Sequence, residues 1–144
     1  MEKIKKICID TDVLIDIAKR KLVRYVSKEL GIFITFITLY EYLRGLAYLG
    51  RDIKASKEEL ESKFSILWPS NEALLKLSEI YQELRRRGKL IPDPDLLIAS
   101  LCIANNIPLS TYNVKHYSRL TIFGLKLVNP EEVIERIKSS ITLY

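Results

Sequence analysis

Short apolar runs rich in β-branched residues alternate along the chain with longer segments of helical periodicity. The apolar runs cover residues 4–9, 32–37, 64–68, 108–111 and 125–128. Strands that alternate with helices form parallel pairs, and the connecting helices cover both faces of the resulting sheet. The sequence therefore predicts an α/β fold with a mainly parallel central sheet of four to five strands, flanked by helices on both faces.

The helical segments differ in how many of their faces are apolar. A helix is predicted from Asp12, a basic amphipathic one over 21–30 that ends at Gly31, and another from Thr38 that closes at Gly50. Further helices are predicted over 51–63, 70–88, 93–104 and from 129 onward. The segment 96–104 is apolar on nearly all sides, which indicates a helix buried within the fold.

Length and composition favour one globular domain over residues 1–144. The chain has 144 residues, of which 48% are hydrophobic and 28% charged, and this balance excludes disordered and collagen-like chains. Cys8 and Cys102 lie in apolar runs with no neighbouring Cys or His, so we expect them to be packed in the core in a reducing compartment.

We expect neither an export signal at the basic start nor a membrane-spanning helix in this sequence. The basic start is followed by an apolar stretch, but Asp10, Asp12 and Asp16 interrupt it, unlike in a signal peptide. The longest uncharged run, 96–114, contains three Asn and one Pro and is too polar to span a bilayer. We expect a cytoplasmic protein without a membrane partner.

Acidic residues follow the predicted strands repeatedly. Asp10 and Asp12 follow the first strand, Glu41 lies one turn into the helix after the second, and Asp93 and Asp95 begin the buried helix. Open α/β sheets bind ligands beyond the carboxyl ends of their strands, where these carboxylates would repel one another. A hard divalent cation such as Mg²⁺ or Mn²⁺ removes that repulsion. Zinc fits poorly, because the chain has a single His and its two Cys lie in apolar runs.

Each of these acids also has a structural explanation. Asp12 can cap its own helix, and Thr38 with Glu41 matches a capping box in which the Glu carboxylate reaches back to the Thr38 amide. Asp93 can cap the helix that it begins, and Asp95 suits the positive end of the helix dipole. Asp10 is the hardest to explain in this way, because it directly follows an apolar strand at the edge of the core.

Four motifs together resemble PIN-domain ribonucleases, especially VapC-type toxins of toxin–antitoxin pairs. The resemblance spans residues 7 to about 130. The motifs are Asp10-Thr11-Asp12, Thr38-Leu-Tyr-Glu41, Pro-Asp93-Pro-Asp95, and Leu109-Ser-Thr111-Tyr-Asn113 with His116-Tyr117.

The resemblance implies an endoribonuclease that depends on one or two Mg²⁺ or Mn²⁺ ions. It implies that Asp10, Glu41, Asp95 and Asn113 are the catalytic and metal-binding residues. Asn113 departs from the Asp often found at its position, since an amide ligates through oxygen but adds no charge. Auxiliary roles beside the metal or substrate fall to Asp12, Asp93, Thr11, Thr38 and Thr111. The resemblance further implies a homodimer and a cognate VapB-type antitoxin that blocks the site.

The charge balance favours an RNA partner. The net charge is +5 and, outside the five acids above, 23 basic residues face 13 acidic ones. The candidate phosphate contacts are Lys19, Arg20, Lys21, Arg85, Arg86 and Arg87. The alternative is that these runs are solvated helix surfaces.

Two other functions fit parts of the sequence. The Asp10-x-Asp12 pair after a strand resembles the opening of haloacid-dehalogenase-like phosphatases, with Asp10 as nucleophile and Asp12 as general acid. That assignment gives Glu41 no role and lacks a later Gly-Asp metal motif. The second alternative is a non-catalytic RNA-binding or scaffold protein on the same fold, which would not need the acids.

Overall fold

The computed structural model describes residues 5–141 as a five-stranded sheet surrounded by helices. The strands are β1 (Ile7–Ile9), β2 (Ile32–Thr35), β3 (Ser65–Leu67), β4 (Leu109–Ser110) and β5 (Leu127–Val128). The α-helices are α1 (Thr11–Lys19), α2 (Phe36–Tyr48), α3 (Ile53–Lys63), α4 (Asn71–Arg86), α5 (Asp93–Ala104), α6 (Val114–Tyr117) and α7 (Pro130–Ile141). Three short 3₁₀ segments are η1 (Val23–Tyr25), η2 (Lys28–Leu30) and η3 (Ser118–Phe123).

The sheet confirms the predicted parallel architecture. Its order is β3-β2-β1-β4-β5, and every neighbouring pair is parallel. The central strand β1 pairs with β2 through Cys8 and Phe33 and with β4 through Cys8 and Leu109. The residues that follow β1 therefore lie at the middle of the carboxyl edge of the sheet, between segments distant in sequence.

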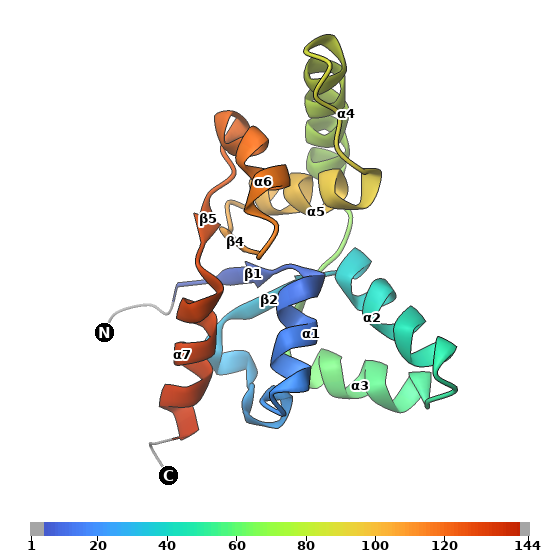
Figure 1. The fold of residues 1–144 in the computed structure, drawn as a ribbon, viewed down its shortest axis with the longest axis vertical. Helices are drawn as coiled ribbons and strands as arrows, with labels where there is room; N and C mark the ends of the chain where they lie inside the picture. The colour runs from blue at the N-terminus through green and yellow to red at the C-terminus, as the bar shows by residue number, and fades with distance from the viewer. Residues whose placement is uncertain (1–4, 142–144) are drawn as a thin grey trace.

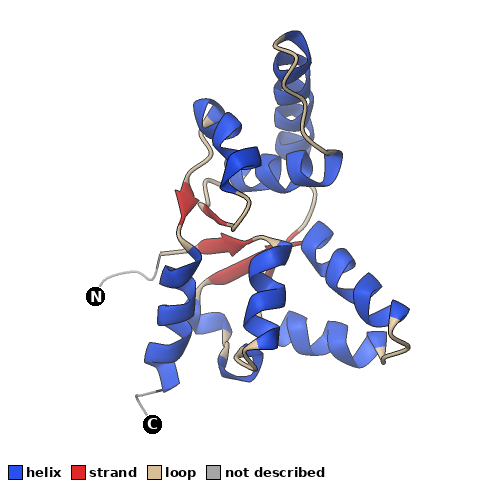
Figure 2. Cartoon of the chain, viewed as in Figure 1, coloured by secondary structure: helices blue, strands red, loops and turns tan. Residues whose placement is uncertain are grey.

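Two separate hydrophobic cores show that helices cover both faces of the sheet (Figures 1 and 2). Cys8 and Leu109 pack on one face in the core that includes residues of α4 and α5. Ile7, Ile9 and Ile32 pack on the other face with residues of α1 and α7. This alternation follows from the period of two along a strand, and it explains why the strands have no polar face.

The segment 21–30 is not the predicted amphipathic helix. Lys21 adopts a left-handed conformation (φ 58°) that ends α1, and Ser27 is extended between the two short segments η1 and η2. Leu22 and Val26 are buried, as the apolar pattern required, but they reach the core through turns. Gly31 closes this stretch at φ 67°, a conformation that favours glycine.

The start of α2 also differs from the prediction. The second strand ends at Thr35 rather than at Ile37, and the helix begins at Phe36, two residues before Thr38. Thr35 is the N-cap, because its Oγ1 accepts a hydrogen bond from the Thr38 amide at 3.1 Å. The first strand was predicted from Ile4, which lies outside the described residues.

The other predicted elements are confirmed. The short run 64–68 contains β3, and the segments 51–63, 70–88 and 93–104 contain α3, α4 and α5. Asn129 starts α7 as predicted, since its Oδ1 accepts a hydrogen bond from the Glu131 amide at 3.0 Å. Both cysteines are free and buried. Within residues 5–141, no helix is both long and apolar enough to cross a membrane.

Candidate active site at the carboxyl edge of the sheet

Asp10 is held at the junction between β1 and α1. Its amide donates to the Ser110 carbonyl at 2.9 Å, which continues the pairing of β1 with β4 by one residue. The Asp10 Oδ1 accepts from the Thr11 amide and Oδ2 from the Thr111 hydroxyl, both at 2.8 Å. Only 6% of the residue is exposed. The carboxylate is therefore buried and fixed in orientation by donors from two separate segments.

Burial and neighbouring charges disfavour the ionised form of this carboxyl. Burial is the largest cause that raises the pKa of Asp10 to about 6, and the negative charges of Asp12 and Asp95 add to it. The hydrogen bond from Thr111 opposes the rise but does not cancel it. The pKa of Asp12 is raised as well, by burial first and with a contribution from Asp95. Three carboxyl groups thus share one region of negative potential.

Asp12 lies in the first turn of α1 and faces the loop after β4. Asp10, not Asp12, is the N-cap, so the predicted capping role of Asp12 is wrong. The Asp12 Oδ2 accepts from the Tyr112 amide at 3.1 Å, whereas its Oδ1 is buried without a hydrogen-bond partner. The hydroxyl of Tyr117 is also buried without a hydrogen-bond partner. Burial is the largest cause that raises the pKa of Tyr117, and the charges of Asp10 and Asp95 add to it. The site therefore contains buried oxygens that nothing within the described chain satisfies.

Glu41 faces Thr11 instead of its own helix terminus. Thr11 Oγ1 donates to Glu41 Oε1 at 2.7 Å and lies 3.0 Å from the hydroxyl of the buried Thr38. The predicted capping box is wrong, because Thr35 rather than Glu41 partners the Thr38 region of the helix. Glu41 is thus directed across to the start of α1, beside Asp10.

Asp95 belongs to the first turn of α5 and contacts His116, for which no role was predicted from the sequence. His116 Nδ1 lies 3.1 Å from Asp95 Oδ2 and 2.9 Å from Asn113 Nδ2. Asn113 precedes α6 and His116 is on it, so one helical turn brings Asn113 to the histidine that contacts Asp95. The spacing of three residues between Asn113 and the only histidine was the available signal.

Asp93 differs from the other acids. It is exposed at the start of α5, the N-cap position is occupied by Pro92, and no side-chain cap is formed there. The predicted capping by Asp93 is therefore wrong, and its auxiliary role in the site stays a prediction.

A second set of contacts fixes the loop after β4 against α1. The Tyr112 hydroxyl donates to Asp16 Oδ2 at 2.6 Å, and Arg20 Nε pairs with Asp16 Oδ1 at 3.1 Å. The hydrogen bond from Tyr112 and the Arg20 guanidinium lower the pKa of Asp16, and the same hydrogen bond raises the pKa of Tyr112 to about 12. Asp16 therefore forms an ion pair with Arg20 and also accepts the Tyr112 hydroxyl.

The donors at this edge fit a hard divalent cation in their chemistry. They are carboxylate, amide and hydroxyl oxygens, and the unpartnered Asp12 Oδ1 lies among carboxyl groups whose charges oppose one another. As the side chains stand, no three His, Cys, Asp or Glu residues within residues 5–141 are gathered closely enough to hold a metal ion. Instead, the Thr11 hydroxyl donates a hydrogen bond to Glu41, and the Thr111 hydroxyl donates one to Asp10.

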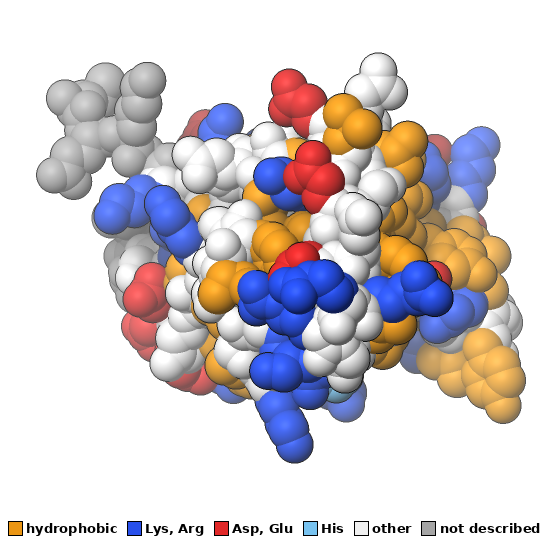
Figure 3. All heavy atoms as spheres, turned by 90° about the horizontal axis from the view of Figure 1, so that it is seen from above, with side chains coloured by type: hydrophobic (Ala, Val, Ile, Leu, Met, Phe, Trp, Pro, Cys, Tyr) orange, Lys and Arg blue, Asp and Glu red, His pale blue; other side chains and the backbone are white. Residues whose placement is uncertain are grey.

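The predicted basic residues lie away from these acids. Arg85, Arg86 and Arg87 end α4, which projects from the body of the molecule in Figure 1. Figure 3 looks onto this projecting end and shows Lys and Arg side chains gathered there. Arg86 and Arg87 both pair with Glu83 and lower its pKa to about 2. In the second predicted basic run, 19–21, Arg20 pairs with Asp16, whereas Lys19 and Lys21 are exposed.

Comparisons with known proteins relate the sequence and the fold to one family. The model of the PIN domain family matches residues 7–120. Ribonuclease VapC1 of Methanocaldococcus jannaschii is 39% identical over 123 residues, which cover 85% of this chain and 86% of that protein. A chain in the crystal structure of VapBC2 from Rickettsia felis bound to a promoter DNA fragment matches with 25% identity and a TM-score of 0.65, covering 85% of this chain and 96% of its own. A chain of DNA-bound VapBC from Salmonella typhimurium has a TM-score of 0.70 at 23% identity, covering 88% and 98%, and supports the fold alone.

Proposed function

The chain belongs to the PIN domain family, and from this membership we propose that it is a VapC-type endoribonuclease whose activity depends on a divalent metal at the carboxyl edge of the sheet. The observation that carries the proposal is the grouping of Asp10, Asp12 and Asp95, whose charges act on one another at the centre of that edge. Neither a structural core nor a simple helix cap needs such a grouping.

We assign the metal to Asp10, Glu41, Asp95 and Asn113, with Mg²⁺ or Mn²⁺ as one or two ions. When bound, such an ion supplies positive charge that stabilises the phosphate oxygens and lowers the pKa of an attacking water. The amide of Thr11 and the hydroxyl of Thr111 hold the Asp10 carboxylate in place, and Thr11 does the same for Glu41. His116 positions Asp95 and Asn113 through Nδ1, which donates to the Asp95 carboxylate when it is protonated and accepts from the Asn113 amide when it is not.

The proton released by the attacking water needs an acceptor at this edge. Asp12 Oδ1 suits that role because it is buried without a partner, and because the raised pKa of Asp12 makes the carboxylate a better base than an exposed one. The Tyr112 amide fixes the other oxygen of the same carboxylate.

The partners proposed here are RNA, a second copy of the chain and a VapB-type antitoxin that blocks the site. The antitoxin is supported by the similarity to a chain of a VapBC structure. RNA contacts through Lys19, Lys21 and Arg85 to Arg87 are supported by their exposure and charge. The homodimer and a cytoplasmic location rest on the sequence resemblance.

The similarity to ribonucleases leaves the two rival functions without a supporting observation. A phosphatase of that type gives Glu41 no role, yet the Glu41 carboxylate is held at the same edge as Asp10 by the Thr11 hydroxyl. A non-catalytic scaffold would not explain why the pKa of Asp10 is raised by burial and by the charges of Asp12 and Asp95.

The test is cleavage of a panel of tRNA, rRNA fragments and mRNA by purified protein with Mg²⁺, with Mn²⁺ and with a chelator. Asp10→Asn and Asp95→Asn each remove one ligand charge, so both should abolish metal-dependent cleavage while circular dichroism shows an unchanged fold. Glu58→Gln, an exposed acid-to-amide change on α3, is the matched control and should cleave as the wild type does. Undiminished cleavage by both folded aspartate variants would overturn the assignment of the site.

A further inference from the structure

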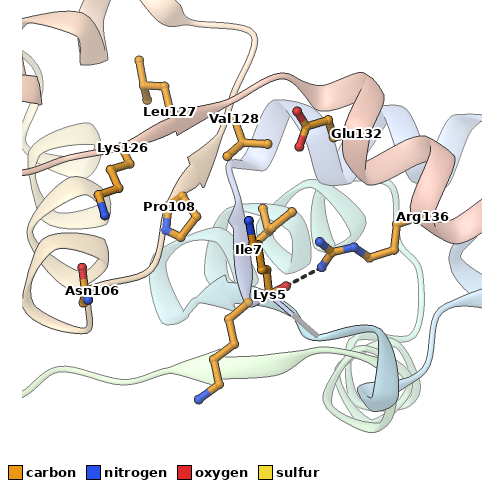
Figure 4. A pocket seen from close by; sticks show the side chains of 10 residues that line it. Lys5, Ile7, Asn106, Pro108, Lys126, Leu127, Val128, Glu132 and Arg136 are labelled. Atoms are coloured by element: carbon orange, nitrogen blue, oxygen red, sulfur yellow. Dashed lines mark hydrogen bonds between the residues drawn. The ribbon is translucent and has the colours of Figure 1, made fainter. Parts of the chain in front are cut away.

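A basic hollow lies at the opposite end of the strands from the acids. It has a volume of about 640 Å³ and is formed where β1, β4 and β5 begin, beside α7 (Figure 4). Its charged lining consists of Lys5, Lys6, Lys126 and Arg136, against the single acid Glu132. We define these residues, with the apolar lining described below, as the amino-edge hollow.

The four cations of the amino-edge hollow have no anionic partner in the described chain. No ion pair within residues 5–141 brings a carboxylate within 4.0 Å of these four side chains. Glu132 acts on Arg136 only at longer range, and Lys6 Nζ lies 5.7 Å from the centre of the Phe33 ring. By contrast, Arg86 and Arg87 share Glu83 although both are exposed. A concave surface that gathers unpaired cations concentrates positive potential and attracts an anion.

Arg136 is positioned in the hollow by the backbone. Its Nη1 donates to the carbonyls of Lys5 at 2.6 Å and Leu30 at 3.0 Å, as Figure 4 shows for the first of these. Its Nε and Nη2 donate no hydrogen bond within the described chain. Half-burial lowers the pKa of the guanidinium, which remains charged because arginine titrates far above neutral pH. The result is a fixed, partly desolvated cation with donors still available.

The remaining lining is apolar and comes from the starts of the strands. Ile7, Pro108, Leu127 and Val128 contribute to the hollow. Figure 4 shows Ile7, Pro108 and Val128 between Lys126 and Arg136, whereas the Leu127 side chain points away from them. A volume of about 640 Å³ lies in the range of sites for small organic ligands. Cations beside an apolar surface suit a ligand that combines phosphate with a flat, weakly polar ring.

We propose that the amino-edge hollow binds a nucleotide unit, with its phosphate on Arg136 and the lysines and its base against the apolar lining. The unit is either a free nucleotide or one residue of an RNA strand, and only the second source depends on the proposed function. Because the acids are at the other end of the strands, the hollow is distinct from the site of cleavage.

Binding is tested with AMP, adenosine and a short single-stranded oligoadenylate, using isotope-labelled wild-type protein in chelator so that no cleavage occurs. AMP should shift the amide resonances of Ile7, Lys126 and Leu127 while those of Thr11 and Thr111 stay unchanged. Adenosine lacks the phosphate and should cause a much smaller shift at the same amides. Oligoadenylate that shifts these amides identifies RNA as the source, and AMP alone identifies a free nucleotide.

The matched variants are Lys5→Gln with Lys126→Gln, and Lys28→Gln with Lys54→Gln on the surfaces of η2 and α3. Both doubles remove two exposed positive charges, but only the first changes the hollow. The hollow double should weaken AMP binding roughly tenfold, since each charge-assisted contact contributes strongly, and the control double should leave it within about twofold. For oligoadenylate, the slope of log affinity against log salt should fall by about 1.4 in the hollow double only.

Three results would overturn the proposal. One is the absence of shifts at Ile7, Lys126 and Leu127 with both AMP and oligoadenylate. Another is an equal loss of affinity in the two doubles. The third is tighter binding of an acidic peptide of equal charge than of oligoadenylate, which would make the hollow a protein-docking surface. Cleavage by the wild-type protein is measured separately with metal, so a failure of this proposal leaves the ribonuclease function intact.

Discussion

Replacing Asp10 by Asn should make the metal-free protein more stable at alkaline pH while abolishing cleavage. Asp10 is 6% exposed and its pKa is raised from 3.8 to about 6, so the folded state binds its proton more tightly than the unfolded chain does. The stabilisation from this proton is fully present below pH 3.8 and is lost as the pH rises through about 6. A shift of roughly 2 units corresponds to about 3 kcal/mol of lost stability at pH 8.

The amide removes that charge and keeps most of the local hydrogen bonds. An Asn side chain still accepts from the Thr11 amide, but its NH₂ group faces the Thr111 hydroxyl, which now needs another acceptor. Losing that bond costs about 1 kcal/mol. The variant should therefore be about 2 kcal/mol more stable than the wild type at pH 8, and about 1 kcal/mol less stable near pH 4.

The assay is urea unfolding of both proteins in chelator across this pH range. The stability difference between variant and wild type should change sign between pH 4 and pH 8. Asp16→Asn is the control of opposite sign, because the pKa of Asp16 is lowered and the amide should lose stability at pH 8. A difference for Asp10→Asn that does not vary with pH would refute the reasoning. Added Mn²⁺ should stabilise the wild type more than Asp10→Asn, since only the wild type keeps the ligand charge.

Three further predictions concern the site and its surroundings. Glu41→Gln should lower metal-dependent cleavage more than about 100-fold with little change in the urea midpoint, because the structure gives Glu41 no capping role. Thr35→Ala should lower the free energy of unfolding by about 1 to 2 kcal/mol in the same urea assay, because it removes the N-cap of α2. Changing Arg85, Arg86 and Arg87 to Gln in the Asp95→Asn protein should leave the midpoint almost unchanged and reduce the salt slope of RNA binding by about 2. An unchanged slope would move the RNA path to Lys19 and Lys21.

The sheet was predictable because its signals are local. Buried parallel strands appear as short apolar runs, and Ser70 and Asn129 mark the starts of α4 and α7 by their capping side chains. The segment 21–30 was predicted wrongly, since buried positions recur in turns with nearly the spacing of a helix. The spacing of Leu22 and Val26 indicates that both are buried. It does not indicate the pattern of backbone hydrogen bonds, which is what distinguishes an α-helix from the observed turns and 3₁₀ segments.

The candidate site was predictable only as a set of residues. Strand ends placed Asp10 and Asp95 near one edge, but the direction of each carboxylate depends on partners distant in sequence. Glu41 matched a capping box by spacing, yet Thr11, 30 residues earlier, competes for its oxygen. His116 contacts Asp95 across 21 residues. Its spacing of three residues from Asn113 indicates a contact with Asn113, but nothing in the sequence indicates the contact with Asp95.

The bond between the Thr111 hydroxyl and Asp10 joins residues 101 positions apart. A ribosome that has made only the first two thirds of the chain has produced Asp10, Glu41 and Asp95 but not β4 or the loop after it. The nascent chain at that stage has no β4 to pair with β1, and the Asp10 carboxylate has the Thr11 amide but not the Thr111 hydroxyl to orient it. Assembly of the acidic edge is thereby delayed until Thr111 has been made, so translation itself sets the earliest moment at which this protein can attack the RNA around it.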